Sequence, residues 1–295
     1  MIDYSLRIIL FLAFFASLLA WQITAPQVKT MRKVKTALKE KTTPANMGQN
    51  MGWKIRWFHN FALFGIDALL VRLIQPTLLT LVALHVTNQP FLYQQWFDQQ
   101  PLLAILIAIL LLDMAIYFQH RLSHSIPLLW RLHKVHHSDP KIDVSSAIRF
   151  HPLEIILSLL YKSAIIAIFA IPVEAVLLFD ILLNSMAMLN HTNGRLFKPL
   201  ERWIRLVIVT PDMHRIHHSV RLHEANSNYG FFLSGWDRLF ASYTASPTDH
   251  PLTVGMPKPT QALRKEEQKQ QPITLTQLLI MPFKQQEKTQ QKSIE

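Results

Sequence analysis

The sequence predicts an all-α, polytopic integral membrane protein with about five apolar helices and a histidine-rich helical cap on one side of the membrane. Half of its 295 residues are hydrophobic and the mean hydropathy is +0.17, which is more apolar residue than a soluble domain of this length needs. The apolar residues gather in stretches long enough to cross, or nearly cross, a bilayer. Polar segments between the later stretches hold most of the 14 histidines.

Five apolar stretches are the expected membrane helices. They are residues 8–24, 61–86, 102–118, 155–171 and 173–189. The first is similar to a signal peptide, but it lacks a clear small-x-small cleavage site, so we expect an uncleaved span. Asp67 and Arg72 interrupt the second and are expected near the cytoplasmic interface or against protein, because charge is costly at the bilayer centre. Pro172 separates the last two, which predicts a hairpin that either spans the membrane or is re-entrant.

Basic residues are concentrated just after the first apolar stretch. The formal net charge is +11, and the dense basic run is opposed only by Glu40. The run consists of Lys29, Arg32, Lys33, Lys35, Lys39 and Lys41. It indicates a cytoplasmic loop over residues 27–57, and counting spans from there places every histidine cluster in the cytoplasm. We therefore expect a bacterial inner-membrane protein. No nucleic-acid recognition motif accompanies the charge, so nucleic acid is not an expected partner.

Three blocks of histidine predict a metal centre. The first block has the spacing His-x-x-x-His and the other two share His-x-x-His-His, so each block places its imidazoles on one face of a helix. Two more histidines stand on either side of the predicted hairpin. The candidate ligands are His120, His124, His133, His136, His137, His151, His191, His214, His217 and His218. The alternative for His151 is a cap on the next helix or a bond to Glu154.

The donor set limits the metal and its chemistry. The chain has no cysteine, which excludes disulfides, thiolate ligands and cysteine nucleophiles. One ion takes about four to six ligands, so this many imidazoles suit two ions, and nitrogen ligation favours iron, copper, nickel or zinc. Two metals beneath helices able to admit a lipid tail indicate oxidation of an unactivated C–H bond. A non-catalytic metal-binding or metal-transport protein is the alternative, but a transporter should place its ligands inside the spans.

Four further residues are candidates for orienting the ligands. Asp113 and Tyr117 precede His120 by seven and three residues, so all three share a helical face. An acid there can hold a ligand imidazole through its other N–H. Asp212 and Asp237 flank the third block and the segment that follows it, and they are candidates for the same role.

These motifs resemble the fatty acid hydroxylase superfamily, also called the sterol desaturase family. The resemblance rests on residues 113–124, 132–138, 150–154, 190–191, 210–219, 226–230 and 236–240, and it covers about residues 55–245. It implies two iron ions, O₂ as co-substrate, a lipid substrate, and a separate electron donor such as a reductase, ferredoxin or cytochrome. Zinc is the expected substitute in isolated protein, because raw affinity favours it over Fe²⁺.

The resemblance implies hydroxylation of a membrane lipid, such as a fatty acyl chain or a sterol, and desaturation on the same scaffold is the second interpretation. One departure from the family pattern is Ala241, where the family often has glycine, and this alanine is expected to strain a turn. The predicted organisation is an N-terminal anchor and basic loop over residues 1–54, a catalytic domain over 55–250, and a polar, poorly ordered tail over 251–295. Within the tail, residues 274–283 are expected to form a short surface helix.

Overall fold

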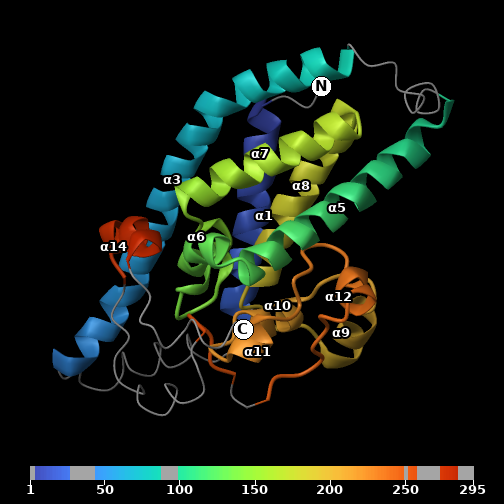
Figure 1. Cartoon of the computed structure of the whole chain (residues 1–295). Coiled ribbons are helices and arrows are strands. Elements are labelled where there is room, and N and C mark those ends of the chain that lie inside the picture. The colour runs from blue at the N-terminus through green and yellow to red at the C-terminus, as the bar shows by residue number, and fades with distance from the viewer. Residues whose placement is uncertain (1–3, 27–43, 88–98, 249–251, 258–272, 285–295) are drawn as a thin grey trace.

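The computed structural model describes residues 4–26, 44–87, 99–248, 252–257 and 273–284 (Figure 1). Every regular element in these ranges is a helix, and β-type pairing within them is limited to three isolated bridges. The predicted all-α class is therefore confirmed. The long helices are α1 (Tyr4–Thr24), α3 (Pro44–Thr87), α5 (Pro101–Ser125), α7 (Pro152–Ile168) and α8 (Val173–His191). The predicted basic run at residues 29–41 lies outside the described residues.

Short helices make up the cap and the connections. They are α6 (Pro127–His137), η1 (Val144–Ile148), α9 (Lys198–Ile204), α10 (Pro211–His217), α11 (Leu222–Ala225), α12 (Gly235–Leu239), α14 (Leu275–Ile280) and η2 (Met281–Phe283). In Figure 1 the helices α9 to α12 lie together beyond the ends of α5 and α8. The cap is therefore built from segments that are too short to be membrane spans.

Membrane spans are evident in the described residues. Three helical stretches are long and apolar enough to cross a bilayer, Gly52–Leu78, Pro101–Ser125 and Val173–His191, and Phe11–Thr24 is a shorter apolar helix. The fourth predicted stretch forms α7, which has 17 residues and packs along α3. The protein is thus an integral membrane protein, and each of the five apolar stretches of the sequence lies largely in a helix.

The start of α3 corrects one expectation. Residues 44–57 were predicted to belong to a loop, but they form the first turns of a 44-residue helix that continues through Pro76. The ring of Trp57 packs against Phe15 of α1 and against Phe61, and Arg56 forms ion pairs with Asp139 and Asp143. Hydropathy finds only the apolar part of a helix, so it missed turns that are held by aromatic and ionic tertiary contacts.

The predicted break between the last two apolar stretches is confirmed. Helix α7 ends at Ile168, and Pro172 is the N-cap of α8. Between them, Ala170 adopts a left-handed backbone conformation with φ of 45°. The turn joins α7 and α8 as an open helical hairpin, whose two helices diverge from the turn (Figure 1).

An apolar core lies between α5 and the α7–α8 hairpin. Its buried members are Ala108, Leu112 and Ile116 from α5, with Ile171, Ala175 and Phe179 from the hairpin turn and α8. We call this cluster the intramembrane core. The last turns of both α5 and α8 carry histidines, so the intramembrane core leads directly to the cap. Fully apolar packing of this kind keeps water away from whatever lies at its end.

Part of the predicted tail packs against the helical body. Helix α14 and the turn η2 contact α3 and α6, and Leu278 is fully buried with Leu63 and Val135. The short helix predicted at residues 274–283 is therefore present, and it supports α6, which carries the second histidine block. The division of the chain into three parts remains a prediction.

Replacing Ala241 with glycine is expected to stabilise the protein. Ala241 has a φ of 55°, in the left-handed region. There a Cβ atom costs about 1–2 kcal/mol. The greater freedom of glycine in the unfolded chain offsets about 0.5–1 kcal/mol of that gain. The thermal midpoint of Ala241→Gly in detergent should rise by a degree or more, whereas the control Ala115→Gly, inside α5, should lower it. A lower midpoint for Ala241→Gly would contradict the strain.

Candidate metal centre

Four helical segments bring the histidines together. The last two turns of α5 carry the first block, α6 the second, α10 and the residue after it the third, and α8 ends at His191. Proline at the first position starts both α6 and α10, where its missing N–H costs nothing. In α10 the Thr210 side chain also caps the helix by accepting from the Met213 amide. Local sequence thus fixes where each block becomes helical.

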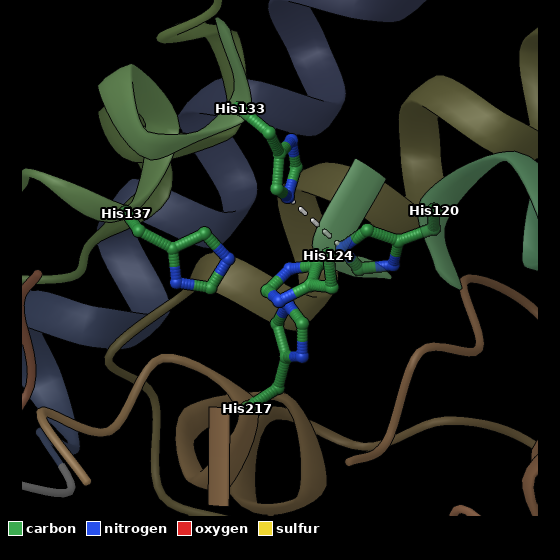
Figure 2. Close-up of side chains that lie close together, drawn as sticks. All are labelled: His120, His124, His133, His137 and His217. Carbon is green, nitrogen blue, oxygen red and sulfur yellow. Dashed lines mark hydrogen bonds between the residues drawn. The ribbon is translucent and has the colours of Figure 1, made fainter. Parts of the chain in front are cut away.

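The histidines form two buried groups. Within each group, one ring nitrogen of every member lies within 4.8 Å of those of the others. Group A consists of His120, His124, His133, His137 and His217, and Figure 2 shows their rings converging from different segments. Group B consists of His136, His191, His214 and His218. The groups adjoin, because the rings of His137 and His218 stack with their centroids 4.4 Å apart.

Hydrogen bonds set the tautomers in group A. The Nδ1 atoms of His120 and His217 lie 2.7 Å and 2.8 Å from the carbonyl oxygens of Tyr229 and Ser227, and Nδ1 of His133 lies 2.6 Å from Glu154 Oε1. Carbonyl and carboxylate oxygens only accept hydrogen bonds, so each of these Nδ1 atoms carries the proton. Each Nε2 atom then has a free lone pair directed into the group.

Lone pairs therefore face one another at short range. Nε2 of His120 lies 3.2 Å from Nε2 of His133, although both are acceptors. Nε2 of His124, Nε2 of His217 and both ring nitrogens of His137 are buried without a hydrogen-bond partner among the described residues. Buried nitrogens without donors are costly, so the arrangement is favourable only with a cation between them.

Group B repeats this pattern. His136 Nδ1 and His191 Nδ1 lie 3.2 Å and 2.7 Å from the carbonyl oxygens of Arg149 and Ala187, which leaves two Nε2 acceptors only 3.0 Å apart. Nε2 of His214 lies 3.1 Å from Nε2 of both His191 and His218. Metal–nitrogen bonds of about 2.0–2.1 Å place neighbouring ligand nitrogens roughly 3.0–3.4 Å apart, so the spacing fits coordination.

Burial keeps the imidazoles neutral. Desolvation, reinforced by neighbouring imidazoles, lowers the pKa of five cap histidines well below the ordinary value. They are His136, His137, His214, His217 and His218. Neutral imidazole is the form that binds metal. The residues present thus fit two metal ions with nitrogen ligands, one held by group A and one by group B.

The structure does not bring His151 to either group. Its Nδ1 accepts from the Leu153 amide at 3.2 Å, which makes it the N-cap of α7. Its Nε2 lies 3.1 Å from the carbonyl oxygen of Leu279 and donates to it. Both ring nitrogens are occupied, so we leave His151 out of the proposed ligand set. The alternative of a helix cap describes its position.

The four candidate orienting residues contact no ligand imidazole by a hydrogen bond in the described structure. Asp113 accepts from the Leu233 amide and the Trp236 indole. The Tyr117 hydroxyl pairs with the Ser242 hydroxyl at 2.8 Å. Asp212 forms ion pairs with Lys198 and Arg215. Asp113 and Tyr117 thus connect α5 to cap segments, and Asp212 joins α9 to α10, so none of the three is placed to orient a ligand directly.

Asp237 acts at one remove from a ligand. It accepts from the amides of Tyr229 and Gly230 at 2.8 Å and 2.9 Å, and the Tyr229 carbonyl is the acceptor for His120. Glycine is required at position 230, because a Cβ there would lie 2.9 Å from both Asp237 Oδ2 and the Leu233 carbonyl oxygen. The Asp237 carboxylate therefore fixes the backbone segment at Tyr229 and Gly230, whose Tyr229 carbonyl orients His120.

Sequence reasoning missed the acid that contacts a ligand directly. Glu154 holds His133, and Asn226 Oδ1 lies 3.3 Å from His124 Nδ1. Glu154 had been considered only as a partner for His151, three residues before it. Glu154 faces α6 from the first turn of α7, and this placement results from tertiary packing that the residue spacing does not indicate.

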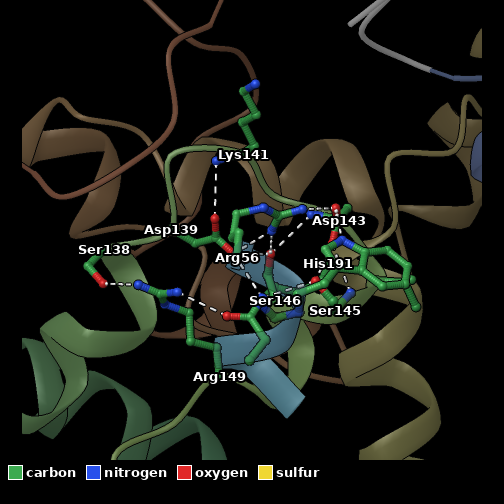
Figure 3. A network of polar contacts seen from close by, with 12 residues as sticks. Arg56, Ser138, Asp139, Lys141, Asp143, Ser145, Ser146, Arg149 and His191 are labelled. Atoms are coloured by element: carbon green, nitrogen blue, oxygen red, sulfur yellow. Dashed lines mark hydrogen bonds and ion pairs between the residues drawn. The ribbon is translucent and has the colours of Figure 1, made fainter. Parts of the chain in front are cut away.

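A charge network also supports group B, as Figure 3 shows. Arg149, whose carbonyl accepts from His136, donates to Asn60, Ser138 and the Val135 carbonyl. Arg56 pairs with Asp139 at 2.7 Å. Burial alone would raise the pKa of Asp139, but the two arginines hold that pKa below its ordinary value. The network fastens the loop after α6 to α3.

Comparison with known proteins confirms the resemblance. Residues 105–242 match the fatty acid hydroxylase family, so this region, which contains both histidine groups, belongs to that family. Ornithine lipid hydroxylase OlsE of Rhizobium tropici is 29% identical over 163 residues, which cover 55% of this chain and 48% of the relative. Alkylglycerol monooxygenase of Homo sapiens is 28% identical over 143 residues, which cover 47% of this chain and 30% of the relative.

The matched relatives are longer than the matched region. The alignment with alkylglycerol monooxygenase of Danio rerio covers 52% of this chain but 33% of that protein. This chain thus spans about half or less of the length of the curated relatives it matches. No solved structure matches the chain.

Removing the charge of Glu154 is expected to weaken metal binding at group A. Glu154→Gln keeps the shape of the side chain but removes the negative charge that accepts the hydrogen bond from His133 Nδ1. Changes of this kind cost about tenfold or more in metal affinity. The measurement is metal retained after dialysis against graded chelator. The control is Glu174→Gln, an exposed acid at the other end of α8, which should retain metal like the native protein. Equal retention by both variants would remove Glu154 from the site.

Proposed function

We propose that this protein, whose residues 105–242 belong to the fatty acid hydroxylase family, is an O₂-dependent di-iron oxidoreductase that hydroxylates a membrane lipid. The observation that carries the proposal is the pair of adjoining histidine groups at the end of the intramembrane core. Nine imidazoles whose nitrogens converge in two groups suit two cations. The apolar core above them suits a substrate that comes from the bilayer.

Each part of the site has a role in that reaction. Two bound irons would supply the redox chemistry that activates O₂, which side chains alone cannot supply. One oxygen atom enters a C–H bond as a hydroxyl group, and the other becomes water with two electrons and two protons from a separate donor. Glu154 and the backbone carbonyls keep the ligand tautomers fixed, and the intramembrane core excludes bulk water.

The relatives support a lipid as the substrate. The names of these relatives give an ornithine lipid and alkylglycerols as the molecules on which they act. For this chain we propose a substrate with a long apolar chain, either a fatty acyl lipid or a sterol. Such a molecule has one polar end for the membrane surface and an apolar body that fits between α5 and α8.

Two alternatives have different signatures. A desaturase on the same scaffold would remove two hydrogens from the lipid and add no oxygen. A metal carrier would bind metal without consuming O₂. The enclosed position of both groups favours the enzyme, because the ligands lie at the ends of α5 and α8 and in the cap rather than along a path across the membrane.

Lipid mass spectrometry tests the proposal. Cells that express the native protein should accumulate a lipid with one added oxygen, and cells that express His217→Ala should not, because group A loses a ligand. The matched control is His223→Ala, an exposed histidine six residues away that lies outside both groups and should keep activity. Loss of two hydrogens would identify a desaturase. Oxygenated lipid at native level with His217→Ala would contradict the metal site.

The absence of cysteine makes the proposed orientation testable. Lys141→Cys places a thiol on the exposed loop near the histidines, and Gln100→Cys places one at the other end of α5. If the histidines face the cytoplasm, an impermeant maleimide should label Gln100→Cys in intact spheroplasts, and Lys141→Cys only after lysis. The reverse pattern would place the site outside.

A further inference from the structure

We infer that Phe231 is the residue on which the lipid chain rests beside the metals, and that it determines which carbon is oxidised; this inference rests on the proposed function. The ring centroid of Phe231 lies 5.1 Å from that of His120 and 6.3 Å from that of His214. Phe231 therefore contacts a member of group A and a member of group B. It also packs against the intramembrane core, so it lies in contact with that core and with both histidine groups.

No other aromatic side chain in the described residues has this combination of contacts. Phe150 stacks on His136 with centroids 4.4 Å apart, and Trp130 lies 5.0 Å from His124, but neither packs against the intramembrane core. Tyr229 touches His120, His124 and His217, all of them in group A. Phe231 alone lies where an apolar chain that follows α5 and α8 would meet both groups.

The backbone around Phe231 is held from both sides. Its carbonyl accepts from Asn190 Nδ2 at 2.7 Å, beside the ligand His191 at the end of α8. The following carbonyl, of Phe232, accepts from the Val209 amide at 2.9 Å. The Leu233 amide donates to Asp113 of α5 at 3.1 Å. The ring is thus fixed relative to both helices that frame the core.

A fixed ring matters because an apolar chain offers no polar group to position. Its carbons differ only in how far along the path they lie, so the shape of the apolar wall decides which one faces the metals. Phe231 is only partly buried, unlike the nearly fully buried His120 and His214 beside it, so part of its face is free to contact a ligand. Removing the ring should change the depth that a chain reaches, without removing a metal ligand.

The test compares Phe231→Ala with native protein in the same lipid background. The carbon that carries the new hydroxyl should shift, or the ratio of positional products should change roughly tenfold, because pocket contacts of one or a few methylenes discriminate by about that factor. Bound iron should stay at the native level. The control is Phe232→Ala, the adjacent phenylalanine, whose ring contacts no imidazole in the described structure and which should keep the native product position.

A second readout does not depend on activity. Phe231 replaced by p-benzoylphenylalanine should form a photo-crosslink to lipid in membranes, detected as a lipid adduct on the peptide that contains residue 231. An unchanged product position with Phe231→Ala, in a protein whose native form is active, would overturn the inference alone. If native protein forms no oxygenated lipid, the proposed function fails in that host, and the crosslink then decides: no lipid adduct at position 231 overturns the inference as well.

Discussion

The structure depends on pairs of imidazole lone pairs that face each other in a buried site. His120 with His133, and His136 with His191, present acceptor nitrogens 3.2 Å and 3.0 Å apart, because oxygen atoms on the far side of each ring fix the proton on Nδ1. Such contacts are repulsive in the empty protein and favourable around a cation. Metal binding and folding of the cap are therefore coupled, since cap segments come together at the point where the nitrogens must converge.

The two groups are chemically unequal. Group A has five imidazoles and a carboxylate, Glu154, behind one of them, whereas the oxygens behind group B are the backbone carbonyls of Arg149 and Ala187. A carboxylate raises the basicity of the imidazole it holds more than a neutral carbonyl does. Ion pairs approach group B through the loop that Arg56 fastens (Figure 3) and through Arg215, which pairs with Asp212 and donates to the Thr192 carbonyl. The two metal positions should thus differ in affinity.

The sequence predicts most of the two histidine groups, because their pattern is local. Eight of the ten candidate histidines belong to blocks with helical spacing, and all eight lie in the two groups together with His191, which ends α8. The tenth, His151, has the same residue type and a similar setting, but its role is decided by Leu279, 128 residues away. Glu154, Asn226 and the carbonyls of Tyr229 and Ser227 were not predictable for the same reason. Their contact with a ligand depends on how distant segments pack, which spacing does not encode.

The carboxylate inside α5 shows how the membrane and the site are connected. Asp113 was expected to orient a histidine, because it shares a helical face with His120, but it binds the Leu233 amide and the Trp236 indole of the cap. A carboxylate in a span is costly, and these two donors satisfy its Oδ2 atom. These bonds fix the position of the segment from Phe231 to Trp236 along α5. The bond from Asn190 to the Phe231 carbonyl fixes the position of the same segment along α8. The position of Phe231 and of both histidine groups along α5 and α8 is therefore fixed by polar groups that border the intramembrane core.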